Sequence, residues 1–181
     1  MSPRPIDARA CLFALLLALG PGPATASDAR VPAAGSDECE VWQRELSFAA
    51  AFERRDMQAF AAHLHPGAVF ALSTAAPTRG ADAVRAEWEP LVTGDAMRFQ
   101  WYPTHVTHAE GTNLATSSGP VLTERPGHAN NRWLVSRYST VWERGRDGVW
   151  RVLFDDGTAP RPASDAEIAQ FRAGRRSTCA A

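Results

Sequence analysis

The spacing of apolar residues changes near Met97, and this change divides the chain into a helical part and a strand part. Before Met97, apolar residues recur every three or four positions in three stretches, which is the spacing of an amphipathic helix. From Met97 onwards, apolar and polar residues alternate, as they do along a strand with one buried face. The pattern therefore predicts helices over about residues 37–54, 56–64 and 81–89, followed by a run of strands.

Local signals mark the ends of these helices. Asp37 opens a pattern that resembles a capping box, and Asp56 can cap the second helix through its side chain. The tripeptide His65-Pro66-Gly67 is expected to end the second helix, and Pro90 to end the third. A short strand is expected at residues 68–73, between these two helices.

The most distinct strand pattern is a hairpin near the end of the domain. Aromatic and β-branched residues from Tyr138 to Trp142 suit a half-buried pleated surface. Asp147-Gly148 is a strong signal for a tight turn. On the return strand, Trp150 and Val152 fall on one face, so this hairpin is expected to complete a sheet whose earlier strands lie over about residues 97–102, 106–109 and 114–122.

The order of these elements indicates the fold class. Helices come first with one strand between them, and a run of antiparallel strands follows, which is typical of an α+β domain. We expect the N-terminal helices to pack on the concave face of a curved antiparallel sheet. A short helix with a capping box at Ser164 and Glu167 is predicted in the C-terminal extension, residues 158–181.

The first residues have the pattern of a targeting segment. Arg4 and Arg9 precede a short apolar run, and Ala24-Thr25-Ala26 matches the small-residue pattern of a cleavage site. Residues 1–26 are therefore interpreted as a signal peptide cut before Ser27, and residues 27–38 as a flexible lead-in. The apolar run is shorter than the roughly 20 residues that a spanning helix needs, so no membrane association is expected after cleavage. The expected location is the periplasm or the exterior.

Removal of this segment leaves two of the three cysteines, Cys39 and Cys179. An oxidising compartment permits a disulfide between them, which would attach the C-terminal tail to the first helix. The alternative is a pair of free thiols on frayed ends.

Charge and motifs exclude several function classes. The net charge of −1 and a composition of 22% charged residues give no basic surface for nucleic acid. No glycine-rich loop matches a nucleotide fingerprint. His105 and His108 lie three apart on a strand, hence on opposite faces, which argues against a shared metal. Neither a metal nor another cofactor is expected.

Several motifs in sequence order resemble the nuclear transport factor 2-like superfamily, and more narrowly its bacterial branch related to ketosteroid isomerase and polyketide cyclase. The motifs are Trp42 to Phe48, Asp56-Met-Gln-Ala-Phe60, Pro66 to Phe70, Arg79-Gly80, and Tyr138-x-x-x-Trp142 with Asp147-Gly148-x-Trp150-Arg-Val.

This resemblance implies that residues 39–157 form a cone-shaped α+β barrel, often dimeric, with a pocket between sheet and helices. It does not imply an activity, because members include isomerases, cyclases, dehydratases and non-catalytic proteins. The isomerases carry a carboxylate base on an early strand, whereas residues 69–73 of this chain contain no acid.

Two residues are candidates for acid–base chemistry. Asp155 ends the last strand, where a carboxylate could reach the mouth of the barrel, although a solvated turn is the common role of such a residue. His105 could act as a base near neutral pH if it faced the pocket, although it can equally lie on the surface.

Aromatic side chains provide the candidate binding residues. Tyr138 and Trp142, four apart on one strand, share a face and could line an apolar pocket with polar tips. Trp88, Trp101 and Ser118 complete the expected lining, although plain core packing would also explain the aromatic residues.

Three function classes remain open. The first is an exported protein that binds a small, largely apolar molecule without covalent chemistry. The second is a cofactor-free isomerase, dehydratase or hydrolase that uses Asp155 or His105. The third is an interaction module that works through the outer face of the sheet.

Overall fold

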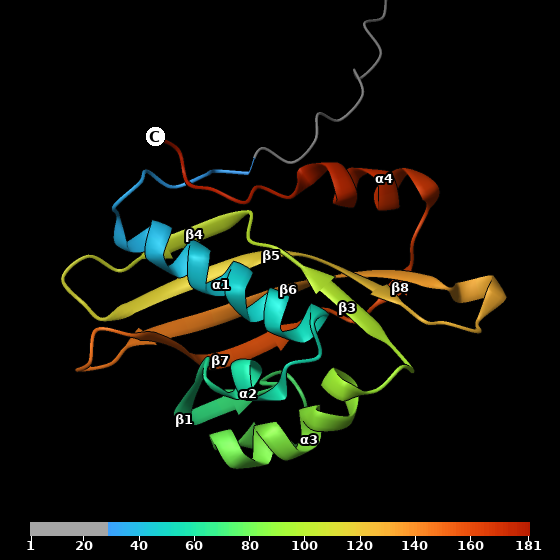
Figure 1. Ribbon diagram of the computed structural model, residues 1–181, viewed down its shortest axis with the longest axis horizontal. Coiled ribbons are helices and arrows are strands. Elements are labelled where there is room, and N and C mark those ends of the chain that lie inside the picture. The colour runs from blue at the N-terminus through green and yellow to red at the C-terminus, as the bar shows by residue number, and fades with distance from the viewer. Residues whose placement is uncertain (1–28) are drawn as a thin grey trace, which may run out of the picture.

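The computed structural model describes residues 29–181, which form four α-helices around one curled sheet (Figure 1). The interpreted signal peptide and its cleavage site before Ser27 lie outside the described residues. The α+β architecture expected from the sequence is confirmed. Within the described range, none of the helices combines the length and the apolar character that a membrane-spanning segment requires.

Three of the four helices begin with a side chain that accepts a backbone hydrogen bond. Helix α1 (Asp37–Glu53) is capped by Ser36, one residue before the expected cap, and α2 (Met57–Ala61) is capped by Asp56. Helix α4 (Asp165–Gly174) has the predicted capping box between Ser164 and Glu167. These caps satisfy backbone N–H groups that the first turn leaves without partners.

Helix α3 (Ala81–Thr93) is longer than the sequence indicated. The expectation that Pro90 ends it is wrong, because the helix continues for three residues to Thr93. Proline removes one backbone hydrogen bond there. The final turn is retained because it places Val92, which is 1% exposed, against the core.

The sheet has the strand order β2-β1-β7-β6-β5-β3, with β4 added beside β5 and β8 beside β6. One pair departs from the antiparallel expectation, because β1 runs parallel to β7 and the sheet is therefore mixed. The strands are Leu64–Phe70 (β1), Thr78–Arg79 (β2), Arg98–Trp101 (β3), His105–His108 (β4), Leu114–Glu124 (β5), Trp133–Arg144 (β6), Trp150–Gly157 (β7) and Arg161–Pro162 (β8).

Strand β1 begins earlier than the sequence suggested. Leu64 pairs with Val152, and the amide of Val152 donates to the carbonyl of His63 at 2.8 Å, so the chain is already extended at the expected end of α2. The segment around Pro66 is accommodated as an irregularity, because the pairing with β7 shifts between Leu64 and Val69. Proline is tolerated at such a position since it cannot donate to the ladder.

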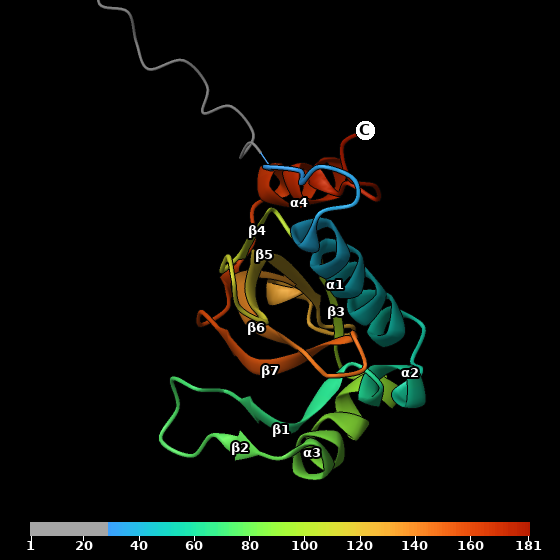
Figure 2. The same cartoon turned by 90° about the vertical axis from the view of Figure 1, so that its left-hand side faces the viewer.

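The sheet is curled (Figure 2), and two features bend it. The register between β6 and β7 shifts at Val141 and Trp142, and such bulges increase local twist. The chain also breaks between β3 and β4 at Pro103, where both strands pair with β5. A Cβ atom on Gly119 would lie 2.0 Å from the carbonyl oxygen of Tyr102, so this close crossing requires glycine.

Apolar side chains form two clusters on opposite faces of the sheet. The inner cluster lies between α1, α2, α3 and the concave face, and it includes Trp101 and Tyr138. The outer cluster joins α4 to the other face through Tyr102, Leu122 and Phe171, and it also includes Trp42 and Leu46 of α1. Strand alternation explains the separation, because neighbouring residues of one strand point to opposite faces.

A disulfide attaches the C-terminal tail to α1, as one of the two alternatives predicted. Cys39 and Cys179 are bonded with their Cα atoms 5.9 Å apart. Beside it, the amide of Ala34 donates to the carbonyl of Ala180 at 2.7 Å, and the amide of Ala180 donates to Pro32 at 2.9 Å. A loop of 140 residues corresponds to about 5 kcal/mol of stabilisation in the chain-entropy model.

Candidate functional site

A fully buried carboxylate, Glu45, lies at the centre of the concave face. The indole nitrogens of Trp101 and Trp142 donate to it at 2.7 and 3.0 Å, and the hydroxyl of Thr140 donates at 2.8 Å. Buried charge is tolerated only when hydrogen bonds replace water, and three donors meet that requirement here. Burial raises the pKa of Glu45, and these hydrogen bonds oppose the rise.

A row of polar side chains crosses the sheet beside Glu45. The pairing register places Ser117 opposite Thr140 on β6, and Thr140 opposite Asp155 on β7. Directly paired residues of antiparallel strands share a face, so this row lies on the concave side. The hydroxyl groups of Ser117 and Tyr138 are hydrogen-bonded at 3.1 Å.

The titratable groups of this row, Asp155 and Tyr138, both have raised pKa values. Burial raises the pKa of Asp155 well above its ordinary value, although part of the side chain still reaches solvent, and the carboxylates of Glu45 and Asp156 raise it further. Burial likewise raises the pKa of Tyr138 well above its ordinary value, with Glu45 as the second cause. A raised pKa favours the protonated form of a carboxyl group, which can donate a proton, and makes its ionised form a stronger base.

Aromatic rings occupy the space between this row and the helices. The ring of Phe48 lies 5.5 Å from Trp101 and 6.2 Å from Trp142, in edge-to-face geometry. Trp88 stacks on Phe60 at 5.6 Å. These contacts are those of core packing.

The residues predicted to line an apolar pocket therefore lie on both faces of the sheet. The buried Trp101, Tyr138 and Trp142 and the half-buried Trp88 belong to the inner cluster. Ser118 follows the inward-facing Ser117 along β5 and so points to the other face.

The predicted histidine candidate, His105, lies on the surface at the start of β4. Its ring nitrogen Nδ1 is 3.0 Å from the hydroxyl oxygen of its neighbour Thr104. Among residues 29–181, no three histidine, cysteine, aspartate or glutamate side chains are grouped so that they could hold a metal ion.

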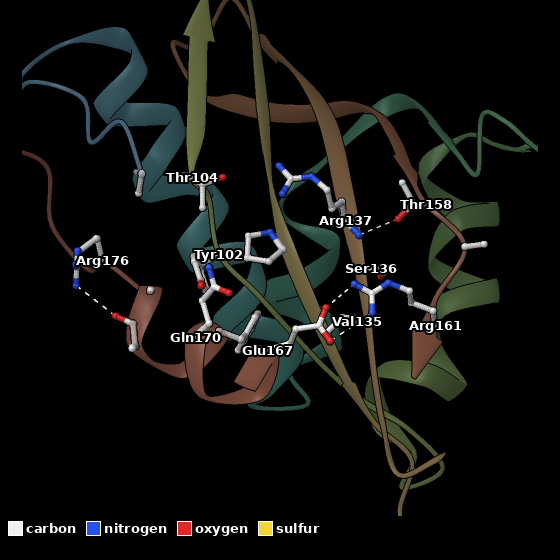
Figure 3. Close-up of a pocket in the computed structure, with 16 residues that line it drawn as sticks. Tyr102, Thr104, Val135, Ser136, Arg137, Thr158, Arg161, Glu167, Gln170 and Arg176 are labelled. Carbon is white, nitrogen blue, oxygen red and sulfur yellow. Dashed lines mark hydrogen bonds and ion pairs between the residues drawn. The ribbon is translucent and has the colours of Figure 1, made fainter. Parts of the chain in front are cut away.

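The larger of the two cavities described in the structure lies on the outer face, between α4 and strand β6 (Figure 3). Its volume is about 710 Å³. The apolar part of its wall is formed by Tyr102, Pro120, Val135 and Phe171. The polar part is formed by side chains of β6, α4 and the segments around them, namely Thr104, Ser136, Arg137, Thr158, Arg161, Glu167, Gln170 and Arg176.

One wall of this cavity is formed by the end of α4 and the tail that follows it, and contacts with the sheet and with α1 hold this wall in place. A Cβ atom on Gly174 would lie 2.4 Å from the hydroxyl oxygen of Tyr102, so the end of α4 approaches the sheet closely. The indole nitrogen of Trp42 donates to the carbonyl of Arg176 at 3.3 Å, and the Cys39–Cys179 disulfide follows three residues later.

The second cavity, of about 310 Å³, is a smaller groove where the ends of α1 and α3 meet β3. Arg55 and Asp95 form an ion pair near its rim. Neither cavity is lined by Trp88, Trp101, Ser118, Tyr138 or Trp142.

Sequence reasoning missed the residues that line the larger cavity. Arg137 precedes the inward-facing Tyr138 on β6 and so lies on the outer face, but nothing in the sequence indicates what covers that face. The useful signal was the amphipathic helix at residues 165–174, whose apolar residues Ile168 and Phe171 require a surface to pack against.

Comparison with protein families identifies the domain type. A family model described as a SnoaL-like domain matches residues 46–153. No match was found among curated proteins.

Solved structures share the fold at low sequence identity. A nuclear transport factor 2-like protein of unknown function from Pseudomonas putida superposes with a TM-score of 0.56 and 21% identity, covering 72% of this chain and 90% of that one. A ketosteroid isomerase-like protein from Erwinia carotovora atroseptica gives 0.52 and 13%, covering 67% and 95%. A protein from Catenulispora acidiphila, solved in complex with S-DNPA, gives 0.51 and 19%, covering 65% and 89%.

The hydrogen bonds to Glu45 predict a specific order of stabilities. Glu45→Leu leaves the indole N–H of Trp101 without an acceptor and leaves that of Trp142 only the hydroxyl of Thr140, at 2.9 Å, so it should lower the free energy of unfolding by about 2–4 kcal/mol. Glu45→Gln places an amide N–H₂ against one indole donor and should cost less, about 1–2 kcal/mol. Urea denaturation at pH 7 measures both values.

The control is Glu53→Gln at the exposed end of the same helix, where only a surface pair with Arg175 is lost. Its effect should stay within about 0.5 kcal/mol. A Glu45→Leu variant as stable as the unaltered protein would contradict the account of the interior.

Proposed function

Because the chain belongs to the SnoaL-like domain family, we propose that it is a binding protein whose small-molecule ligand occupies the cavity beneath α4. Members of this family often bind small molecules or resemble isomerases. The observation that carries the proposal is the cavity itself, whose volume of about 710 Å³ falls within the range of small-molecule sites. The neighbour solved in complex with S-DNPA adds support, since that protein holds a ligand on the same fold.

The lining of the cavity favours binding over catalysis. Glu167 is its single carboxylate, and the guanidinium of Arg161 holds the pKa of Glu167 down to about 2. Burial raises the pKa of Tyr102. Near neutral pH the first group is therefore ionised and the second protonated, and neither is tuned for proton transfer.

The cavity depends on a part of the chain outside the family match. That match ends at residue 153, whereas one wall is formed by residues 158–176. The family domain therefore provides the sheet and the C-terminal extension closes the site.

Export of the protein is part of the proposal. The Cys39–Cys179 disulfide is of the kind that persists in an oxidising compartment. A periplasmic or secreted binding protein agrees with this bond and with the targeting pattern of residues 1–26.

Filling the cavity should abolish binding. Gln170 is exposed on α4 and lines the cavity, so Gln170→Trp would place an indole within it. A thermal-shift screen with uncharged and charged amphipathic molecules should identify compounds that stabilise the unaltered protein and not this variant. Stabilisation follows from ligand binding to the folded state alone.

Ala169→Trp is the matched control, because Ala169 is exposed on the same helix but does not line the cavity. The control should retain every thermal shift. Compounds that stabilise both tryptophan variants equally would place the ligand elsewhere, and a screen in which nothing stabilises the protein would argue against a binding function.

A second candidate function is acid–base catalysis at Asp155. The specific observation in its favour is the raised pKa of this half-buried carboxyl beside Glu45 and Tyr138, since such shifts are common at catalytic sites. The ketosteroid isomerase-like neighbour is consistent with it at the level of fold. His105, which is exposed beside Thr104, is the weaker candidate for a base.

Proton exchange from carbon acids tests this second function. In deuterated water, a base at Asp155 should catalyse deuterium incorporation next to the carbonyl of an enolisable ketone, which NMR detects. The ionised form is the base, and burial raises its pKa, so the rate should increase with pH above the range in which exposed carboxylates titrate.

Asp155→Asn should lower the exchange rate at least about 100-fold, which is the usual contribution of a general base. Asp165→Asn, at the exposed start of α4, should leave it unchanged. Exchange that persists in Asp155→Asn would remove the catalytic hypothesis.

A further inference from the structure

The wall of the α4 cavity carries an excess of positive charge. Its ionisable side chains near neutral pH are Arg137, Arg161, Arg176 and Glu167, which gives a net charge of 3 − 1 = +2. This contrasts with the whole chain, whose formal net charge is −1. The positive charge is therefore a local property of the cavity.

One of the three arginines is already neutralised. The guanidinium of Arg161 holds both carboxylate oxygens of Glu167, one of them at 3.3 Å, and this pair crosses the wall in Figure 3. Among the described residues, neither Arg137 nor Arg176 forms an ion pair with a carboxylate. The guanidinium of Arg176 donates to the carbonyl of Ala173 at 3.4 Å, whereas that of Arg137 has no hydrogen-bond partner within the described part of the chain (Figure 3). The charge of Arg137 is therefore the more available to a ligand.

The backbones that carry these two arginines are fixed. Arg137 donates its amide to the hydroxyl of Thr158 at 3.0 Å and accepts from the amide of Thr158 at 2.9 Å. Arg176 is held through its carbonyl by Trp42. A fixed backbone limits the region that each guanidinium can reach, and the planar fork of arginine is already arranged to bind an anion.

Apolar surface lies beside this charge. Tyr102 and Phe171 are buried, with ring centroids 4.8 Å apart, and Pro120 and Val135 extend the apolar wall along the sheet. A ligand that satisfies both parts of the wall must itself be amphipathic.

We propose that the α4 cavity selects an amphipathic anion, with an acidic head group held by Arg137, the positive charge of Arg176 on the same cavity wall, and an apolar body against Tyr102 and Phe171 (Figure 3). This assignment rests on the proposed binding function and narrows its ligand class. A carboxylate suits the forked geometry of a guanidinium, which donates two parallel hydrogen bonds to such a group.

A matched pair of probes separates the effect of a ligand's charge on affinity from the effect of its shape. The probes are 2-naphthylacetate and its uncharged amide, 2-naphthylacetamide, which have nearly the same size. Isothermal titration calorimetry at low salt should give an affinity about tenfold higher for the acid, because charge-assisted hydrogen bonds are stronger than neutral ones. The preference should decrease at high salt because exposed guanidinium groups are screened.

The double variant Arg137→Gln, Arg176→Gln should remove the preference while leaving the affinity for the amide unchanged. Arg172→Gln is the control, since this α4 arginine lies over the ring of Trp133 and does not line the cavity. The control should retain the tenfold preference.

The results distinguish failure of this inference from failure of the proposed function. Equal affinities for the two probes, both lost in Gln170→Trp, would overturn the anion preference and keep the cavity as a binding site. A preference for the acid that survives the double variant would also overturn it. Binding that is insensitive to Gln170→Trp, or absent for both probes, would overturn both proposals.

Discussion

The rest of the structure depends on how the carboxylate of Glu45 is buried. A charged group removed from water destabilises the fold unless fixed donors replace the solvent. Glu45 obtains its donors from β3 and β6, so the position of α1 against the sheet is set by the geometry of Trp101, Trp142 and Thr140. Aromatic rings then pack around this centre and exclude water from it. The side chains of the concave face therefore contribute mainly to the stability of the fold.

The outer face of the sheet has a different role. Helix α4 covers it incompletely, because Ile168 and Phe171 pack on the sheet while Gln170 and Arg176 stand at the edge of a cavity. The disulfide at Cys179 and the close approach of Gly174 to Tyr102 hold this cover in position. We therefore assign stability mainly to the inner face and ligand binding to the outer one. Asp155, whose pKa is raised by burial, lies at the margin of the inner face and is the one residue there that we propose for chemistry.

The elements that sequence predicts well are those specified by local chemistry. The Asp147-Gly148 turn and the capping box at Ser164 follow from residues close together in the chain, and both are present. Contacts between distant segments were harder to foresee. The parallel pairing of β1 with β7 depends on residues more than 80 positions apart, and the cavity depends on where α4 meets β6. Glu45 did leave a signal, because a charged residue lies within the apolar stripe of α1, but its partners could be found only in three dimensions.

The location of a bound molecule tests this division of roles most directly. A crystal structure of the protein soaked with 2-naphthylacetate should show electron density for the naphthyl ring between α4 and β6, beside Tyr102 and Phe171. Density among the rings of Trp88, Trp101 and Trp142, with those side chains displaced, would place the ligand on the concave face and contradict the account.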